Sequence, residues 1–317
     1  IADAMGRAGR GVFEMIPAGT VGKLERLGGE RTTPEAEVKL MADFSRQSGR
    51  KVTFTLVQSP DYAPDTWERL LEMVVTANQT GAQLYPQVSS RPIGLASGLS
   101  GYHAFQRRPT YMKLAHLPLA ERAREMAKPE IKAAIMSETD VLVDQPGSMA
   151  NMYQLFQTAA MFLYPLADPV DYEPDPSEML GSRAAATGQD VLDLLYDYLL
   201  EQDGAAMCAL MGGPNVHDSQ EVLRQMLIHP ETVTGLSDAG AHVTLICDAT
   251  MPTTQLTFWA RDRHKGERLP LEFLVAKQTA RNADLYGLKD RGRLAVGLRA
   301  DINVIDFENL RVSPPKA

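Results

Sequence analysis

The sequence predicts an α/β fold of parallel strands and helices, arranged as a (β/α)8 barrel of the TIM type that is incomplete in this chain. Short apolar, β-branched stretches alternate with amphipathic stretches of helical period along most of the 317 residues, which is typical of parallel βα units. No Gly-x-Gly-x-x-Gly follows any predicted strand, and this excludes a dinucleotide-binding sheet. About five units can be counted, fewer than the eight that close a barrel.

The first two strands and the helix between them are marked by their ends. Residues 11–16 (GVFEMI) and 51–57 (KVTFTLV) are predicted to be buried strands. The stretch between them predicts a helix, because Thr33 suits its cap, Pro34 suits its first turn and Gly49 can end it.

The next unit follows directly. Asp65 and Glu68 have the spacing of a capping box, and the apolar stripe behind them predicts a helix that stops at Gly81. Residues 82–88 (AQLYPQV) predict a third strand, which Pro86 should bend or end.

The middle of the chain is less regular. Residues 89–117 are rich in Pro, Gly and Ser and are predicted to form a long loop. Residues 117–138 predict a helix broken at Pro129, and residues 152–164 predict another helix. Residues 165–179 are acidic, contain several prolines and are predicted to lie at the surface.

Two further βα signals close the series. Residues 190–204 predict an amphipathic helix, and residues 205–211 (AAMCALM) predict a strand. Asp218 and Glu221 repeat the capping-box spacing before another helix, and residues 232–236 (TVTGL) predict the last strand.

Composition limits the partners. The formal net charge is −8 and Lys and Arg form no block, so nucleic acid is not expected as a partner. No apolar run approaches the ~20 residues that span a bilayer, so no membrane partner is expected. The two cysteines, Cys208 and Cys247, fit a reducing compartment, and we expect a cytoplasmic protein that acts on a small molecule.

The last predicted strand ends in the stretch SDAGAH, which presents Asp238. In a (β/α) barrel the active residues lie at the C-terminal ends of the strands, so this carboxylate is the leading candidate for catalysis. An Asx turn or a helix cap after a strand is the structural alternative.

Two segments near the C-terminus resemble one family. TVTGLSDAGAH (232–242) is similar to the last barrel strand of the amidohydrolase superfamily, where a lone Asp closes a metal-dependent site. LKDRGRLAVGLRADINVIDFENL (288–310) is similar to that superfamily's exit from the barrel into a small β-sandwich. GRGVFEMIP, SGRKVTFTLVQSP and TGAQLYPQVSSRPIGL resemble successive segments of its N-acyl-D-amino-acid deacylase (D-aminoacylase) branch.

This resemblance implies two partial units. Residues 1–287 would form part of an amidohydrolase barrel, and residues 288–317 would begin the β-sandwich. The likeness covers the second half of the family's chain, so we expect the fragment alone to be inactive. The first half of the family carries a His-x-His pair and a further metal ligand.

The metal ligands are where the sequence departs from the family. The family has a histidine on each of the strands that match GVFEMIP and VTFTLVQSP, whereas this chain offers Glu14 or Gln58 as the nearest polar residue. The resemblance implies zinc, with Asp238 as one ligand and the other ligands absent from this chain.

Five residues are expected at the site. Asp238 would take a proton from a water and return it to the leaving amide nitrogen. Arg91 follows a barrel strand and could bind a substrate carboxylate, or it could be a solvated Arg before Pro. His242 could orient Asp238 or bind substrate, and Gln87 and Ser90 could add polar contacts.

The sequence thus predicts a hydrolase of C–N bonds other than peptide bonds, most simply one that deacylates N-acyl-D-amino acids. Another amidohydrolase that acts on a cyclic amide has the same signals. A catalytically inactive barrel that binds a small molecule is the alternative of a different class, and the missing histidines favour it. The oligomeric state is left open, a homo-oligomer included.

Overall fold

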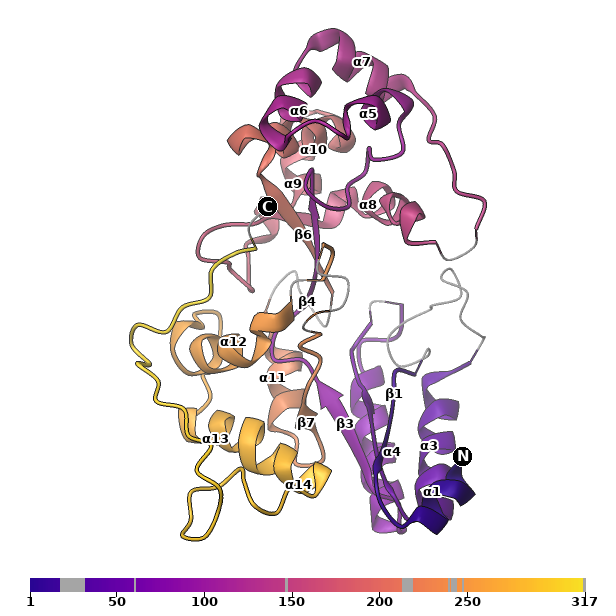
Figure 1. The fold of residues 1–317 in the computed structure, drawn as a ribbon, viewed down its shortest axis with the longest axis vertical. Helices are drawn as coiled ribbons and strands as arrows, with labels where there is room; N and C mark the ends of the chain where they lie inside the picture. The colour runs from indigo at the N-terminus through magenta and orange to yellow at the C-terminus, as the bar shows by residue number, and fades with distance from the viewer. Residues whose placement is uncertain are drawn as a thin grey trace.

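The computed structural model describes residues 1–17, 32–59, 61–145, 148–212, 219–238, 240, 244–246 and 248–315. Figure 1 shows an elongated molecule with a parallel sheet and its helices toward one end and a largely helical excursion at the other. None of the helices in the described ranges is long and apolar enough to cross a membrane.

The parallel sheet has the strand order β1-β2-β3-β7. Its strands are β1 (Val12–Met15), β2 (Lys51–Thr55), β3 (Leu84–Val88) and β7 (Val233–Thr234). All three pairings are parallel, and helices α3 (Pro34–Ser48) and α4 (Thr66–Gln79) form the crossovers between the first three strands. The predicted parallel βα units are therefore confirmed for these strands.

The two crossover helices begin differently. Thr33 caps α3 as predicted, because its hydroxyl accepts a hydrogen bond from the Ala36 amide. Asp65 makes no such bond at the start of α4. There the Gln58 side chain accepts the Trp67 amide at 3.0 Å, so a residue from the end of the preceding strand region takes over the cap.

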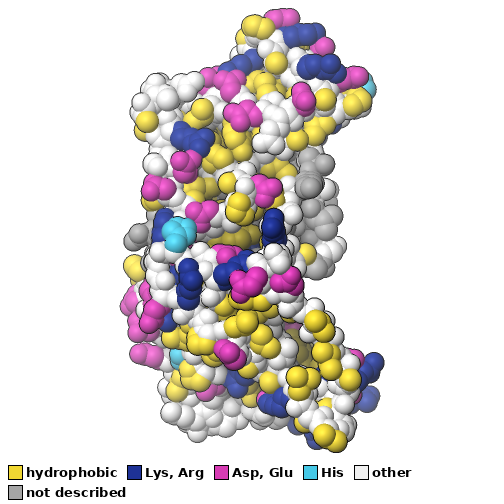
Figure 2. Space-filling model, turned by 90° about the vertical axis from the view of Figure 1, so that its left-hand side faces the viewer, with side chains coloured by type: hydrophobic (Ala, Val, Ile, Leu, Met, Phe, Trp, Pro, Cys, Tyr) yellow, Lys and Arg dark blue, Asp and Glu magenta, His cyan; other side chains and the backbone are white. Residues whose placement is uncertain are grey.

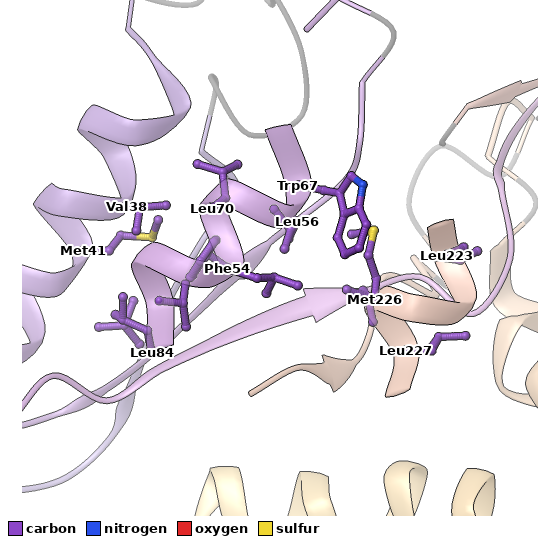
Figure 3. Packing of buried hydrophobic residues seen from close by; sticks show 14 of the residues in the cluster. Val38, Met41, Phe54, Leu56, Trp67, Leu70, Leu84, Leu223, Met226 and Leu227 are labelled. Carbon is purple, nitrogen blue, oxygen red and sulfur yellow. The ribbon is translucent and has the colours of Figure 1, made fainter. Parts of the chain in front are cut away.

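The core of the parallel sheet lies on the face that α3 and α4 cover (Figure 3). Phe54 and Leu84 point from the strands to meet Val38 and Leu70 from the helices, and Met226 joins them from α11 (Glu221–Ile228). All five side chains are almost fully removed from solvent. Burial of each such side chain stabilises the fold by roughly 1.5–3 kcal/mol.

A second, antiparallel sheet lies in the excursion between β3 and β7. Its order is β4-β6-β5, formed by β4 (Ile93–Gly98), β6 (Met207–Gly212) and β5 (Leu163–Pro165). A separate apolar cluster forms its core together with the helices of the excursion. These helices are α5 (Pro109–Leu114), α6 (Leu119–Met126), α7 (Pro129–Ser137), α8 (Tyr153–Thr158), α9 (Leu180–Thr187) and α10 (Val191–Leu200).

Three predictions about this middle region were wrong. The range 89–117 is not one loop, because it contains β4 and α5. The helix expected over 152–164 ends early and gives way to β5. The acidic segment 165–179 is not wholly at the surface, since Glu173 is fully buried in an ion pair with Arg263 at 3.1 Å.

The remaining helices complete the outer layer and the C-terminal region. They are α1 (Ala2–Ala8), α12 (Met251–Thr257), the π-helical turns η7 (Phe258–Asp262) and η8 (Lys277–Arg281), α13 (Leu271–Ala276) and α14 (Asn282–Tyr286). In Figure 1 the chain then runs back past α13 and α12 toward β6.

The described residues show neither a closed barrel nor a β-sandwich. The described strands form open sheets and no closed barrel. The described residues 288–315 form no strand, and Leu294, Val296 and Val304 are almost fully exposed there. On the face that carries α12, α13 and this segment, hydrophobic side chains stand at the surface among charged ones (Figure 2). These exposed side chains lack the partners that a sandwich would give them.

A buried lysine ties the C-terminal helices to the parallel sheet. Lys277 is 6% exposed, and its ammonium donates to Thr232 Oγ1 at 2.8 Å and to the His229 carbonyl at 3.2 Å, just before β7. Burial, with a smaller effect of Arg281, lowers the pKa of Lys277 to about 7.

This lysine should make stability depend on pH. Between about pH 7 and the unfolded value of 10.5 the unfolded chain binds a proton that the folded chain has lost. Stability should therefore rise with pH across that window. We expect Lys277→Met to remove this rise in the free energy of unfolding, measured by urea denaturation at several pH values. An equal rise in both proteins would contradict the expectation.

Candidate active site

Asp238 lies in the chain segment that follows β7. Its side chain is exposed, and its backbone has a φ of 35°. Leu236, two residues earlier, has a φ of 66°. Positive φ is tolerated by Asp but is a true outlier for Leu, and such strain is often found at functional sites. The backbone of this segment is therefore strained, and the Asp238 side chain is exposed to solvent.

Arg91 lies beyond the end of β3 and is buried rather than solvated. Its side chain is 4% exposed, and Nη1 lies 2.7 Å from Asp248 Oδ1. Nη2 donates to Thr250 Oγ1 at 3.1 Å, and the guanidinium lies over the Tyr172 ring at 4.7 Å. A substrate carboxylate would meet a guanidinium that already holds a carboxylate.

Asp248 is the site residue that the sequence reasoning missed. It begins the short helix η6 (Asp248–Thr250) and is 1% exposed. Burial raises the pKa of Asp248, the Arg91 charge lowers it, and the negative charge of Asp238 raises it. Asp238 and Arg91 follow the ends of the paired parallel strands β7 and β3. The sequence did contain a signal for Asp248, because this acidic residue stands between an apolar run and the start of a helix.

A small cavity opens beside this pair. It encloses about 100 Å³, with Arg91, Thr250 and Tyr172 among its polar lining residues. The rest of the wall is mainly apolar and comes from β4, β6, the segment after β5 and the C-terminal segment, with Pro92, Gly94, Ala96, Leu166, Val170, Ala209, Met211, Ser313 and Pro315. A few polar groups in an apolar wall are typical of a small-molecule site, but such sites usually enclose roughly 300–1,000 Å³, so this cavity would have to widen to hold a substrate.

Gln87 and Ser90 are both buried, and both side chains have protein partners. The Ser90 hydroxyl donates to the Met251 carbonyl at 2.7 Å. Gln87 Nε2 donates to Glu14 Oε1 at 2.9 Å. Glu14 itself is exposed, and its other oxygen accepts the Tyr286 hydroxyl at 3.2 Å. These bonds tie β1, β3 and α14 together at one face of the sheet.

Gly235 lets the end of β7 pass close to Gln87. A Cβ built on Gly235 would lie 2.1 Å from Gln87 Oε1 and 2.9 Å from its Cδ. Only glycine fits this approach without displacing the amide. The glycine of TVTGL is thus explained by packing against Gln87, three residues before Asp238.

One predicted site residue cannot be placed. His242 lies outside the described residues. The roles assigned to His242 stay predictions.

The part of the chain that the structure describes offers no set of metal ligands. Among the described residues no group of three or more His, Cys, Asp or Glu side chains could hold one. Gln58 is buried and donates to the Ser59 and Ala63 carbonyls at 2.9 and 3.0 Å while its oxygen accepts the Trp67 amide. Its side chain therefore serves the local backbone and is not directed at a ligand.

Residues 2–317 match the model of the amidohydrolase family, and the chain belongs to that family. It is 33% identical over 147 residues to the imidazolonepropionase of Paracoccus denitrificans (strain Pd 1222), which covers 44% of this chain and 36% of that protein. It is 52% identical over 46 residues to the N-acyl-D-glutamate deacylase of Alcaligenes xylosoxydans xylosoxydans, which covers 14% of this chain and 9% of that protein.

Two solved structures are also similar. The N-acyl-D-glutamate deacylase from Bordetella bronchiseptica, in complex with zinc and a phosphonate inhibitor, has a TM-score of 0.39 and 16% identity over 84% of this chain and 42% of its own. A D-aminoacylase with a binuclear metal centre has a TM-score of 0.45 and 12% identity over 94% of this chain and 46% of its own. The chain spans less than half the length of each of these relatives.

The contact between Gly235 and Gln87 can be tested by substitution. We expect Gly235→Ala to destabilise the fold by about 1–3 kcal/mol, because the new methyl must push aside a buried, bonded amide. In a protein that already carries Gln87→Ala, the Gly235→Ala substitution should cost much less stability, because the clash is gone. Chemical denaturation measures both. Equal destabilisation by Gly235→Ala with and without Gln87 would show that the contact is not the cause.

Proposed function

We propose that the protein hydrolyses the amide C–N bond of N-acyl-D-amino acids, with Asp238 as the acid and base. The observation that carries this proposal is that the exposed Asp238 and the buried Arg91 follow the ends of the paired parallel strands β7 and β3, in a chain of the amidohydrolase family. The short match to an N-acyl-D-glutamate deacylase supports this choice of substrate class.

The proposed reaction needs two proton transfers. Asp238 takes a proton from a water as the water oxygen bonds to the acyl carbon. It then gives that proton to the amide nitrogen as the C–N bond breaks, which releases a carboxylic acid and an amino acid. An exposed carboxylate can take this proton and return it, whereas the buried Asp248 is held by Arg91.

Substrate contacts are proposed at the cavity beside Arg91. The guanidinium would bind the substrate carboxylate, sharing its donors with Asp248. Ser90 and Gln87 would act on the substrate only after exchanging their present bonds to Met251 and Glu14. His242 is proposed as a further contact because it follows Asp238 closely in the sequence.

Zinc is proposed for the protein on the basis of family likeness, with Asp238 as one ligand. The described residues supply no complete ligand set, so no step above is assigned to a metal. If zinc binds, it would polarise the acyl oxygen and acidify the water, and its other ligands would come from outside the described residues.

Two rival functions remain as proposals. Hydrolysis of a cyclic amide is favoured by the longer match to an imidazolonepropionase, 33% identical over 147 residues. Binding without catalysis is favoured because the Gln58 side chain bonds to the local backbone and the described residues contain no cluster of metal ligands.

We also propose that residues 1–287 belong to the barrel and that residues 288–317 begin the sandwich. We further propose that the protein is cytoplasmic and forms a homo-oligomer.

The catalytic proposal can be tested on Asp238 directly. We expect the protein to hydrolyse N-acyl-D-amino acids and Asp238→Asn to lower kcat by about 100-fold or more, since an amide cannot exchange the protons. The assay should include L-enantiomers and cyclic imides, and metal content should be measured on the same preparations.

The outcomes separate the alternatives. Turnover of cyclic imides alone would support the first rival. Ligand binding without turnover in the parent protein would support the second. Full activity of Asp238→Asn would remove Asp238 as the acid and base, and full activity in a preparation free of metal would remove zinc.

A further inference from the structure

We propose that Asp248 is a positioning residue that fixes the Arg91 guanidinium and the loop of Asp238 in one geometry. The inference rests on the proposed function, because it concerns how the carboxylate-binding Arg91 and the proton-transferring Asp238 are kept at a set separation. It assigns to Asp248 no contact with the substrate and no proton transfer.

The Arg91 guanidinium is held by several neighbouring groups. Asp248 Oδ1 accepts hydrogen bonds from Arg91 Nη1 at 2.7 Å and from the Gly94 amide at 3.3 Å. Thr250 accepts from Nη2 at 3.1 Å, and the Tyr172 ring lies under the guanidinium. A planar guanidinium held at its edge and on its face keeps one orientation. Asp248 is the only charged member of this set among the described residues.

Residues 244–246, a few positions after Asp238, lie alongside β4. The Ala96 amide donates to the Leu245 carbonyl at 2.7 Å. Leu95 and Ile246 form an antiparallel bridge. A few residues later the Met251 carbonyl accepts the Ser90 hydroxyl at 2.7 Å. Asp248 lies in the middle of this returning stretch.

Asp248 therefore connects Arg91 with the segment that follows Asp238. Its backbone belongs to the segment that follows Asp238, and its side chain holds Arg91 from the end of β3. A buried carboxylate and a buried guanidinium each need the other, because either one alone would be an uncompensated charge in the interior. The spacing between the acid/base and the substrate anchor is thus set through one side chain.

A purely structural role would look different from a positioning role. Loss of a structural ion pair lowers the amount of folded protein and leaves each folded molecule with its normal KM. Loss of a positioning residue changes KM and kcat in the folded molecules. It does so mainly for substrates that use Arg91.

The experiment compares Asp248→Asn with Asp140→Asn in the whole chain. Asn keeps the size of Asp and removes the charge. The control pair of Asp140 and Arg108 is also an Asp–Arg contact, at 3.0 Å with both side chains 15% exposed, in the helical excursion. The substrates are an N-acetyl-D-amino acid and its primary carboxamide, which lacks the carboxylate that Arg91 would bind.

We expect Asp248→Asn to lower kcat/KM for the free acid by about 100-fold, the scale of an ångström-sized misplacement. For the carboxamide the rise in KM should be absent, whereas kcat should still fall because the Asp238 loop has moved. Asp140→Asn should leave both substrates unaffected per folded molecule. Unchanged kcat and KM for the free acid in folded Asp248→Asn would overturn the proposal.

A readout without turnover separates this inference from the proposed function. Amide hydrogen exchange of Ala96, whose donor bond goes to Leu245, should accelerate at least about tenfold in Asp248→Asn and stay unchanged in Asp140→Asn. If the parent hydrolyses nothing, the proposed function fails. Accelerated exchange would then still support the proposal that Asp248 fixes the segment after Asp238. Unaltered exchange would overturn that proposal.

Discussion

The buried ion pair of Arg91 and Asp248 is the contact on which the site's geometry depends. Arg91 extends from the end of the parallel sheet, and Asp248 belongs to the segment that returns from the strained turn at Leu236 and Asp238. Gly94, at the start of the antiparallel sheet, donates its amide to the same carboxylate. The end of the parallel sheet and the nearby start of the antiparallel sheet therefore meet a segment more than 150 residues later at one pair of opposite charges.

Burial makes this pair a strict constraint. Removing one partner of a buried pair leaves an uncompensated charge, which typically costs about 3–5 kcal/mol, although replacing both partners by apolar groups can be nearly neutral. The pair is therefore weak as a source of net stability and strong as a source of geometry. The same arrangement leaves Asp238 in solvent and close enough for its charge to act on Asp248.

The parallel sheet could be predicted because its signals are local. Thr33 and Gly49 mark the ends of α3, and apolar β-branched stretches mark β2 and β3. β4 could not be predicted in this way, because its sequence IGLASG is rich in small residues and becomes a strand only by pairing with β6, more than a hundred residues later. Strand formation by distant pairing leaves little trace in the local pattern.

The positions of the candidate residues followed from the strand ends. The strand-end rule selected Asp238 and Arg91, which follow the paired strands β7 and β3, while their roles stay predictions. The rule could not select Asp248, which lies after a loop and matters through its contact with a residue 157 positions away. Nor could it anticipate that Gln58, in place of a family histidine, caps α4.

A double-mutant cycle on Arg91 and Asp248 tests the central claim most directly. The free energies of unfolding are measured for the parent, Arg91→Met, Asp248→Leu and the double variant. We predict that the double variant loses less free energy of unfolding than the two single variants lose together, by about 2 kcal/mol or more. Losses that add within about 0.5 kcal/mol would contradict it, because independent residues cannot hold the two sides of the site together.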